Sequence, residues 1–311
     1  MMSAPHARIG VIGGLNMDIH LFGAGMDGRP GLLTAKDYLV EPGGKGANQA
    51  RAVARLGASA ILVGRIGQDE FGRMCLAEVA DDGVDTSFVV QTPDQRTGFV
   101  VIDLVEGHHV TRVLVPGAND GLEWEHVEPA LDTLARCDAV VTQAEIPPVV
   151  LSALTSWCGE SGVPLFLDPS PPQAVTQQML AGAEAITPDA TEAGGLTGRE
   201  VSTEPMARMA AADLLALGVR RVLVKLGTDG TLLAGGEGAE MVPTIAVKAV
   251  DETGAGDVFM AGLVVARAGG EDWTEAVRFA NAASALSVSR SGLALPTFAE
   301  VQKALGDPGR P

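Results

Sequence analysis

Residues 139–168 read AVVTQAEIPPVVLSALTSWCGESGVPLFLD, and this stretch contains two different apolar patterns. The runs 139–142 and 164–167 are short and almost wholly apolar, which is typical of buried strands, whereas 149–158 has the length and apolar spacing of a helix. A strand, a helix and another strand in this order form the repeating unit of a parallel sheet with helices on its faces. The stretch therefore predicts an α/β fold.

The same alternation extends towards both ends of the chain. Further helices are expected at 43–56, 71–80, 125–134, 175–181, 206–217, 256–268 and 273–289, and further strands at 8–13, 60–66, 185–187, 221–225, 231–234 and 241–245, with a strand-like run at 244–250. We expect a single α/β domain over residues 1–311. Ligands of such sheets bind beyond the carboxyl ends of the strands, so polar residues that follow strands are site candidates.

Two β-rich patches, near 33–42 and 97–116, interrupt this alternation, and the rest of 16–42 has no regular pattern. The two patches could pair with each other as a small sheet outside the main one. We therefore expect lid strands from about 16–42 and 97–116. A lid of this kind excludes water from a transfer reaction.

The composition excludes several classes of protein. A net charge of −17, from 22 basic and 39 acidic residues, argues against a nucleic-acid partner and against an anionic membrane surface. Three widely spaced cysteines support neither a disulfide framework nor a zinc site. The sequence contains no apolar run of about 18 residues and no signal-peptide pattern before the first strand, so we expect a cytoplasmic protein.

The segment Asp251-Glu252-Thr253-Gly254-Ala255-Gly256-Asp257 directly precedes an apolar run that predicts a helix. Glycines at a helix start let backbone N–H groups approach an anion closely, and the helix N-terminus adds partial positive charge. An acid beside such an anion trap is costly unless it takes part in the chemistry. The pattern predicts a site that stabilises a migrating phosphoryl group, with Asp257 accepting the proton of the acceptor hydroxyl.

A second glycine-rich segment, Pro42-Gly43-Gly44-Lys45-Gly46-Ala47-Asn48-Gln49-Ala50, opens another helix. Lys45 and Asn48 are three residues apart, so they share one face of the first helical turn. Convergent donors and acceptors of this kind suit a sugar. The alternative is a glycine-rich loop that serves only the tight packing of a strand against a helix.

Polar residues after other strands extend the candidate sugar site. Asn16 and Asp18 are two residues apart, so in an extended chain both point to one face and could bind neighbouring hydroxyls. An Asx turn at the strand end is the alternative. Glu145 could bind another hydroxyl or could be a solvated surface carboxylate.

Two further segments could contact a nucleotide. Asp189-Ala190-Thr191-Glu192 opens a helix, where first-turn acids suit capping; alternatively, Glu192 orders a water-bound Mg²⁺ near phosphates. Leu226-Gly227-Thr228-Asp229-Gly230 could be a hairpin turn, since Asp-Gly is a strong turn signal, or Gly227 could lie against a nucleotide's phosphates or ribose.

Taken together, these segments resemble ribokinases and the wider phosphofructokinase-B-type carbohydrate kinase family, from Ile9 to about Pro296. The segment from Asp251 to Asp257 is similar to a motif shared across that family. The segment from Gly43 to Ala50, together with Pro116-Gly117-Ala118-Asn119 and Gln143-Ala144-Glu145-Ile146-Pro147, is similar to ribokinases in particular.

This resemblance implies a three-layer α/β/α ribokinase-like fold with a mostly parallel central sheet and a small β-sheet lid. It implies ATP and Mg²⁺ as cofactors, with K⁺ as a candidate activator. The implied catalytic residues are Asp257 and the amides of Gly254, Ala255 and Gly256. The implied sugar ligands are Asn16, Asp18, Gly44, Lys45, Asn48 and Glu145. The implied nucleotide contacts are Asp189, Glu192, Lys225, Gly227, Gly230 and Asn281, with Mg²⁺ near Glu192 and a monovalent cation at Asp251 and the Thr253 carbonyl.

Three departures from the family pattern are present. Asp189 stands where the family usually has asparagine, and Lys225 stands where ribokinases usually have a hydroxyl residue. The segment 290–296 is shorter than the usual ribokinase loop, which bears on the remaining ligands of the monovalent cation.

The resulting hypothesis is an ATP-dependent kinase that phosphorylates the primary hydroxyl of a pentose, with D-ribose converted to ribose 5-phosphate. A nucleoside, 2-deoxyribose or a fructose derivative is the alternative acceptor, and a non-catalytic sugar or nucleotide sensor is a third hypothesis. A dinucleotide-dependent oxidoreductase is disfavoured, because no G-x-G-x-x-G follows Gly13-Gly14. By analogy, paired lid edges would make a homodimer.

Overall fold

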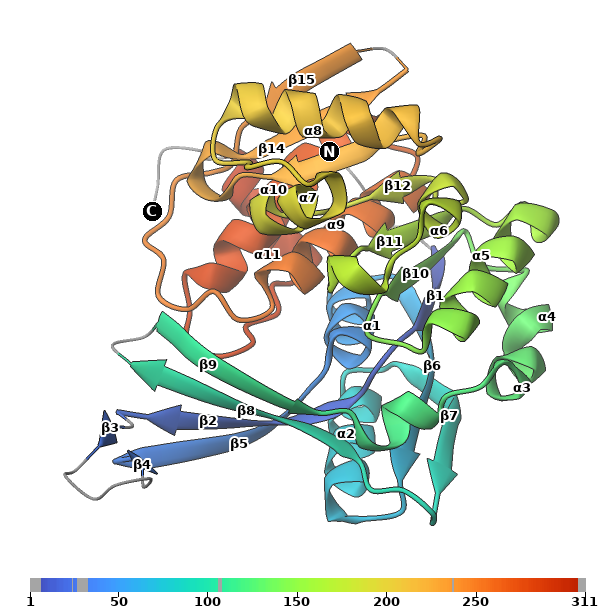
Figure 1. Cartoon of the computed structure of the whole chain (residues 1–311), viewed down its shortest axis with the longest axis vertical. Helices are drawn as coiled ribbons and strands as arrows, with labels where there is room; N and C mark the ends of the chain where they lie inside the picture. Colours follow the sequence, from blue (N-terminus) through green and yellow to red (C-terminus); the bar gives the residue numbers. More distant parts are fainter. Residues whose placement is uncertain (1–6, 24, 27–32, 106–107, 237, 307–311) are drawn as a thin grey trace.

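The computed structural model of the chain describes residues 7–23, 25–26, 33–105, 108–236 and 238–306. Within these residues, nine strands form one sheet with helices on both faces, and four strands form a smaller sheet that projects from the body (Figure 1). The predicted three-layer fold with a β-sheet lid is therefore confirmed.

The main sheet is parallel from β7 to β13, and β14 alone runs in the opposite direction, antiparallel to both β13 and β15. The interior strand β1 is buried at Ile9, Val11 and Ile12, because helices cover both faces of the sheet. Across the sheet the strands are β15 (Gly238–Val242), β14 (Thr231–Gly235), β13 (Val222–Lys225), β12 (Ala185–Ile186), β11 (Leu165–Asp168), β10 (Ala139–Gln143), β1 (Arg8–Ile12), β6 (Ser59–Gly67) and β7 (Asp85–Thr92).

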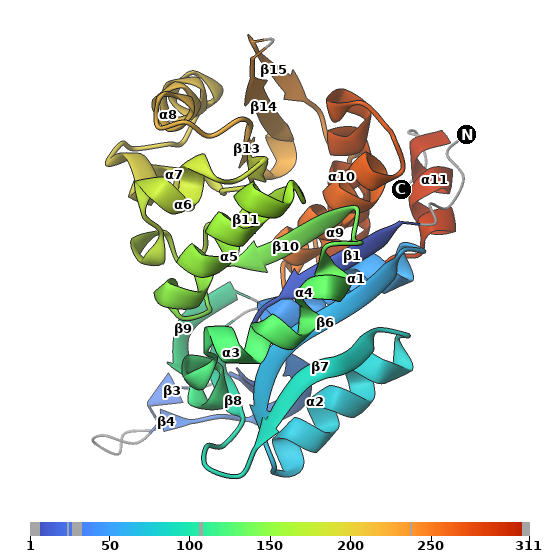
Figure 2. The same cartoon turned by 90° about the vertical axis from the view of Figure 1, so that its right-hand side faces the viewer.

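Two apolar cores lie on the two faces of this sheet. One is built with α1 (Lys45–Arg55), α2 (Glu70–Asp81), α9 (Ala255–Ala268), α10 (Trp273–Val288) and α11 (Phe298–Gly306). The other, whose α3, α4 and α5 face the viewer in Figure 2, is built with α3 (Trp124–Val127), α4 (Leu131–Leu134), α5 (Pro148–Ser161), α6 (Gln177–Ala181), α7 (Ala190–Thr197) and α8 (Glu204–Ala216). None of the helices in the described part of the chain is both long and apolar enough to cross a membrane.

Small residues let α9 and α10 pack closely. A Cβ placed on Gly262 would lie 2.9 Å from the Cα of Ala280, a distance that real Cβ atoms do not adopt. Close packing against α10 fixes the position of α9 and of its N-terminus, which carries the predicted anion site.

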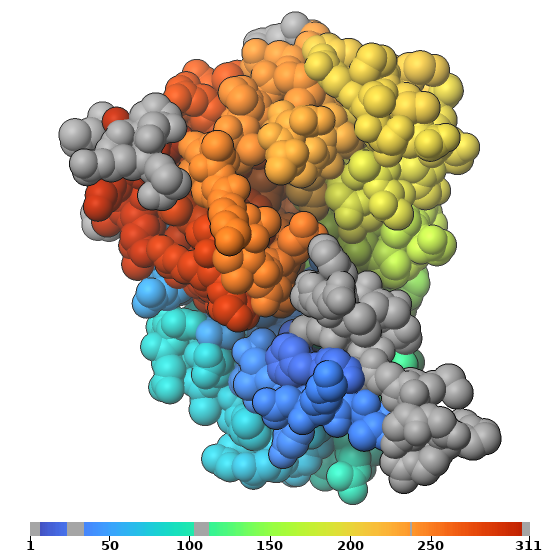
Figure 3. Space-filling model, turned by 90° about the vertical axis from the view of Figure 1, so that its left-hand side faces the viewer, coloured from blue at the N-terminus to red at the C-terminus, as the bar shows by residue number. Residues whose placement is uncertain are grey.

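The lid has the strand order β5 (Asp37–Gly43), β2 (Asn16–Phe22), β8 (Gly98–Val105) and β9 (His108–Val115). The expectation that 16–42 is mostly irregular is wrong for β2, and the two β-rich patches do not pair directly because β2 lies between them. Figure 3 shows the blue lid strands below the orange and red C-terminal segments. A short pair, β3 (Gly25–Met26) and β4 (Leu33–Thr34), extends this end.

Several helices and strands differ from those that the sequence predicts. The helix expected at 125–134 is interrupted by a 3₁₀ turn at Glu128–Ala130, because Pro129 has no N–H to donate. No strand forms at 244–250, where the chain leaves β15 through Pro243 and runs over the surface with Val250 exposed. The expected strand at 241–245 is displaced to β15. The edge strand β7 and the C-terminal helix α11 were not predicted.

Candidate active site

The glycine-rich loop before α1 brings this helix against the end of β1. Gly44 has a φ of 92°, and a Cβ on it would lie 2.6 Å from the backbone nitrogen of Asn16. A Cβ on Gly46 would lie 2.5 Å from the carbonyl carbon of Gly13. The loop therefore packs tightly, and the same packing brings Lys45 and Asn48 to the carboxyl end of the sheet. Sugar binding by these residues stays a prediction.

Lys45 is the cation of a buried acidic cluster. Its Nζ lies 3.0 Å from Asp168 Oδ2 and 4.0 Å from Asp257 Oδ1. Asp168 ends β11 and is almost completely buried. Asp168 is a polar residue at a strand end, and nothing local in the sequence indicates that it pairs with Lys45, 123 positions away. This ion pair holds the ammonium group beside the predicted base.

Asp257 lies in the first turn of α9 and is buried. Its Oδ2 accepts a hydrogen bond from Asn48 Nδ2 at 3.2 Å, and its Oδ1 accepts one from Gln49 Nε2 at 3.0 Å. Burial raises the pKa of Asp257, while Lys45 and the two amide donors act in the opposite direction. The carboxyl group is thus a buried proton acceptor supported by one cation and two neutral donors.

Gly254 caps α9 with a φ of 71°, which a residue with a side chain adopts only at a cost. The side chain of Leu293 packs where a Cβ of Gly254 would be, at 2.2 Å. The first backbone N–H groups of this helix have no partner within the helix, although that of Ala255 donates to the Glu252 carbonyl at 3.2 Å. Anion binding by these amides stays a prediction. Lys225 Nζ lies 3.3 Å from the point that a Cβ on Gly256 would occupy. Lys225 therefore adds a full positive charge beside this N-terminus.

Asn16 and Asp18 project from the same face of β2, because they are two residues apart in a strand. Asn16 Oδ1 accepts a hydrogen bond from Asn119 Nδ2 at 2.8 Å, so the Asn16 side chain is held in place from a distant segment. The sequence reading noted the segment that contains Asn119 without assigning this residue a role. Asp18 packs against Gly43. A Cβ on Gly43 would lie only 2.1 Å from Oδ2 of Asp18.

Glu145 follows β10 and faces the same cluster. The charges of Lys45, Asp257, Asp168 and Asp18 all act on its carboxyl group, which places these residues in one site. Burial raises the pKa of Glu145 to about 7 and that of Asp18 to about 6. The reading of Glu145 as a solvated surface residue is therefore wrong.

These shifts predict how stability depends on pH without ligand. In the unfolded chain Glu145 titrates near 4.5, so between that pH and about 7 the folded protein binds more protons than the unfolded one. The free energy of unfolding should therefore fall as the pH rises through this window. Glu145→Gln should remove part of the slope and raise stability above the window by on the order of 2 kcal/mol. Urea denaturation of both proteins across the window is the measurement, and identical slopes would contradict the prediction.

The predicted nucleotide residues lie on neighbouring strand ends. Asp189 caps α7, and its side chain and that of Glu192 exchange hydrogen bonds of 2.7 Å with each other's backbone N–H, which confirms the capping interpretation. Lys225 Nζ lies 4.0 Å from Glu192 Oε2. Gly227 and Gly230 belong to the turn between the antiparallel strands β13 and β14, so the hairpin interpretation is also confirmed.

Asn281 lies on α10 with its amide fully engaged. It accepts a hydrogen bond from Thr231 Oγ1 at 2.7 Å and donates one to the Val242 carbonyl at 2.9 Å. These bonds tie α10 to β14 and β15. A contact of Asn281 with ATP stays a prediction.

Asp251 joins two loops next to α9. Its Oδ1 accepts from the Thr253 N–H at 2.9 Å, and its Oδ2 accepts from the Gly292 N–H at 3.0 Å. The short 290–296 loop therefore lies against the segment that carries the predicted cation ligands.

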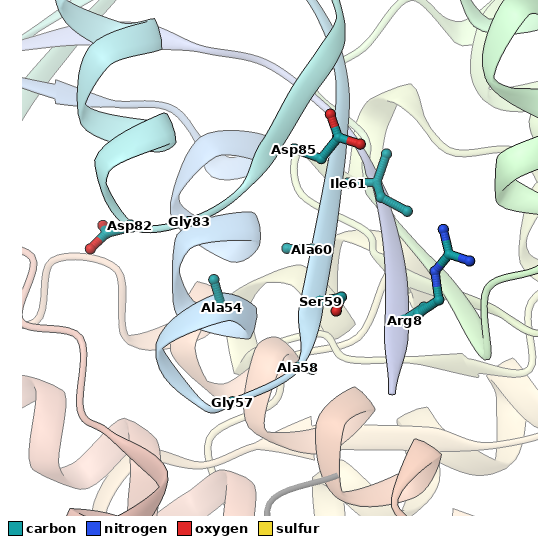
Figure 4. A pocket seen from close by; sticks show the side chains of 10 residues that line it. All are labelled: Arg8, Ala54, Gly57, Ala58, Ser59, Ala60, Ile61, Asp82, Gly83 and Asp85. Atoms are coloured by element: carbon teal, nitrogen blue, oxygen red, sulfur yellow. The ribbon is translucent and has the colours of Figure 1, made fainter. Parts of the chain in front are cut away.

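A separate hollow lies at the opposite end of the sheet, and Figure 4 shows it. It is lined by residues at the amino ends of β1, β6 and β7, among them Arg8, Ser59 and Asp85. Ligands of parallel sheets bind at the carboxyl ends of the strands, so this hollow is not part of the candidate active site.

Comparison with known proteins agrees with this geometry. The model of the pfkB family carbohydrate kinases matches residues 6–299. The ribokinase of Haemophilus influenzae is 33% identical over 93% of this chain and 95% of its own length, and that of Bacillus subtilis is 33% identical over 96% and 99%. The structure of Arabidopsis thaliana ribokinase complexed with ribose and ATP superimposes with a TM-score of 0.88 at 30% identity, covering 97% of this chain and 99% of that one. This chain therefore belongs to the pfkB family of carbohydrate kinases.

Proposed function

We propose that the protein transfers the γ-phosphoryl group of ATP to the primary hydroxyl of D-ribose and so forms ribose 5-phosphate. One observation carries this proposal. The carboxyl group of Asp257 is buried at the N-terminus of α9, supported by Asn48 and Gln49 and adjacent to Lys45. A proton acceptor thus stands next to a cluster of backbone donors, as phosphoryl transfer to a hydroxyl requires.

Each group has a definite task in this reaction. Asn16, Asp18, Gly44, Lys45, Asn48 and Glu145 bind the hydroxyls of the sugar. The amides of Gly254, Ala255 and Gly256 stabilise charge on the transferred group, and Asp257 accepts the hydroxyl proton as the new bond to phosphorus forms. Lys225 and the segment Gly227–Gly230 lie towards the nucleotide phosphates.

The residues present fit a magnesium ion that is held mainly by water and phosphate. No group of three or more metal-binding side chains occurs in the described part of the chain, and Glu192 is a single half-buried carboxylate beside the anion site. Mg²⁺ commonly takes few protein ligands and keeps several waters. When bound, it would neutralise charge on the phosphates, with Glu192 orienting its water. Asp251 and the Thr253 carbonyl would hold a monovalent cation.

A coupled ADP assay tests the function. Pentoses, hexoses and nucleosides are supplied with ATP and Mg²⁺, with and without K⁺. We expect D-ribose to have the highest kcat/KM, and we expect ADP release to require the sugar. A higher kcat/KM for a nucleoside, 2-deoxyribose or a fructose derivative would reassign the acceptor, and sugar-independent or absent turnover would contradict the proposal.

We also infer a cytoplasmic homodimer formed through the lids. One face of the lid sheet carries Asn16 and Asp18, and the opposite face carries Tyr38 and Val113, which are 68% and 53% exposed. Exposed apolar patches of this kind favour association with a second copy.

Val113→Lys should convert the dimer into a monomer at micromolar concentration, because it places a charge in the buried centre of the interface. Light scattering of the two proteins is the measurement. Val149→Lys, a substitution of an equally apolar and 73% exposed residue on α5, is the control that should not change the mass. A wild-type protein that is monomeric throughout would refute the inference.

A further inference from the structure

Two fully buried glutamines form a hydrogen-bonded chain that ends on Asp257. Gln143 Nε2 donates to Gln49 Oε1 at 2.5 Å, and Gln49 Nε2 donates to Asp257 Oδ1 at 3.0 Å. Gln143 is the last residue of β10, and Gln49 lies in the second turn of α1. The chain therefore connects the central sheet to the base through a helix.

We propose that Gln49, oriented by Gln143, is a positioning residue that holds the carboxyl group of Asp257 ionised and turned for proton abstraction. The proposal rests on the function proposed above, in which Asp257 is the base.

The orientation of the Gln49 amide is set by Gln143. A glutamine side chain has a donor end and an acceptor end, and only the donor end stabilises a carboxylate. The Gln143 N–H occupies the Gln49 oxygen, so the Gln49 nitrogen must face Asp257. Gln143 itself has little freedom, since its Oε1 lies 2.2 Å from the position of a Cβ on Gly13.

The group that Gln49 presents to Asp257 is a neutral amide donor. An amide keeps its protons throughout the accessible pH range, so it stabilises the carboxylate without exchanging a proton with it. It also brings no full charge that would make Asp257 a weak base. The nearby cation, Lys45, is closer to Asp168 than to Asp257, at 3.0 Å against 4.0 Å. Both groups face Oδ1 of Asp257, but the Gln49 amide donates a hydrogen bond at 3.0 Å, whereas the ammonium group stays 4.0 Å away.

Gln49 affects the pH dependence of turnover through the pKa of Asp257. The charged and titratable groups that face Asp257 are Lys45 on α1, Asp168 on β11, Asp18 on β2 and Glu145 after β10. Burial and Asp168 raise the pKa of Asp257, and Lys45 with the two amide donors lowers it. Removal of the Gln49 donor should raise this pKa further. Turnover needs the ionised base, so the acid limb of the kcat–pH profile should move to higher pH.

The test is Gln49→Met, which keeps the length of the side chain and removes the donor. With saturating sugar and ATP, we expect the acid limb to rise by about one pH unit, the effect of one hydrogen bond to a charged group. Turnover should fall roughly tenfold on that limb and much less on the alkaline side, with sugar KM changed by no more than about twofold. A folded Gln49→Met enzyme with the wild-type acid limb would overturn the proposal.

Two further variants separate positioning from simple destabilisation. Gln143→Met should shift the limb in the same direction, and it should add nothing in the Gln49→Met background, because Gln143 acts only through Gln49. Independent, additive shifts would refute this. Arg51→Met, on the same helix, removes the ion pairs with Glu78 and Asp82 and should lower stability without moving the limb. If Gln49→Met does not fold, Gln143→Met alone decides the question.

A readout that needs no turnover keeps the two proposals distinguishable. The ¹³C carboxyl resonance of Asp257, assigned by its loss in Asp257→Asn, reports the titration of this group directly. An upward shift in Gln49→Met supports the positioning role even if the wild-type protein phosphorylates no sugar, in which case only the proposed function fails. An unchanged titration in an active enzyme removes the positioning role alone.

Discussion

Asp257→Asn should lower kcat by roughly 10²- to 10⁴-fold, the usual share of a positioned general base. An asparagine keeps the volume of the side chain but cannot accept the hydroxyl proton at neutral pH. Its amide end would also oppose one of the two N–H donors that now face the carboxylate, from Asn48 or Gln49. The proposed sugar contacts of Asn16, Asp18 and Glu145 are retained, so sugar affinity should stay nearly intact.

The measurement is a comparison of kcat with the dissociation constant of the sugar, obtained by calorimetry. Asp213→Asn is the matched control, since Asp213 is an exposed acid on α8 that pairs with Arg199, far from the site. It should leave both quantities unchanged. An Asp257→Asn enzyme with near-normal turnover would show that another group accepts the proton.

Lys45→Met should have the largest effect on stability. Asp168 is almost completely buried, and Lys45 is the cation that hydrogen-bonds to it, at 3.0 Å. Removal of one partner of a buried ion pair leaves the other charge uncompensated, which typically costs about 3–5 kcal/mol. Asp257 loses its nearby cation at the same time. We therefore expect a large loss in the free energy of unfolding together with loss of sugar binding.

The double variant Lys45→Met/Asp168→Asn distinguishes these two effects. It removes both charges, so most of the lost stability should return, while sugar affinity and turnover should stay low because the proposed sugar contact of Lys45 is still missing. Urea denaturation and calorimetry on the single and double variants give the comparison. A Lys45→Met protein as stable as the wild type would show that Asp168 does not need its cation.

The helices and strands that the sequence predicted well are those whose patterns are local. The alternation around 139–168 is set by residues a few positions apart, and the structure has β10, α5 and β11 there. Strand β2 was not recognised, although Asn16, Asp18 and His20 alternate with Met17, Ile19 and Leu21 in the period-two pattern of a strand with one polar face. The three polar residues share the face of β2 that carries the proposed sugar-binding residues.

In the candidate site, too, the sequence indicated residues with local patterns but not the contacts between distant segments. The residue types around Asp257 and Lys45 indicated phosphoryl transfer before any contact was known. Their partners could not be read from spacing: Asn48 lies 209 positions from Asp257, and Asn119 lies 103 positions from Asn16. Asp168, Asn119 and Gln143 look like ordinary polar residues at strand ends or in loops.

By itself, the sequence determined the α/β alternation, the glycine-rich start of α9 and the acid that follows it, because hydrophobic period and glycine content act within a few residues. Tertiary structure alone decided which buried groups lie together, namely the Asp257 carboxyl group, the Lys45 ammonium group and the amides of Asn48 and Gln49. Those choices depend on segments from β1, β10, β11, α1 and α9 meeting at one end of the sheet, and on burial that changes how strongly their charges interact.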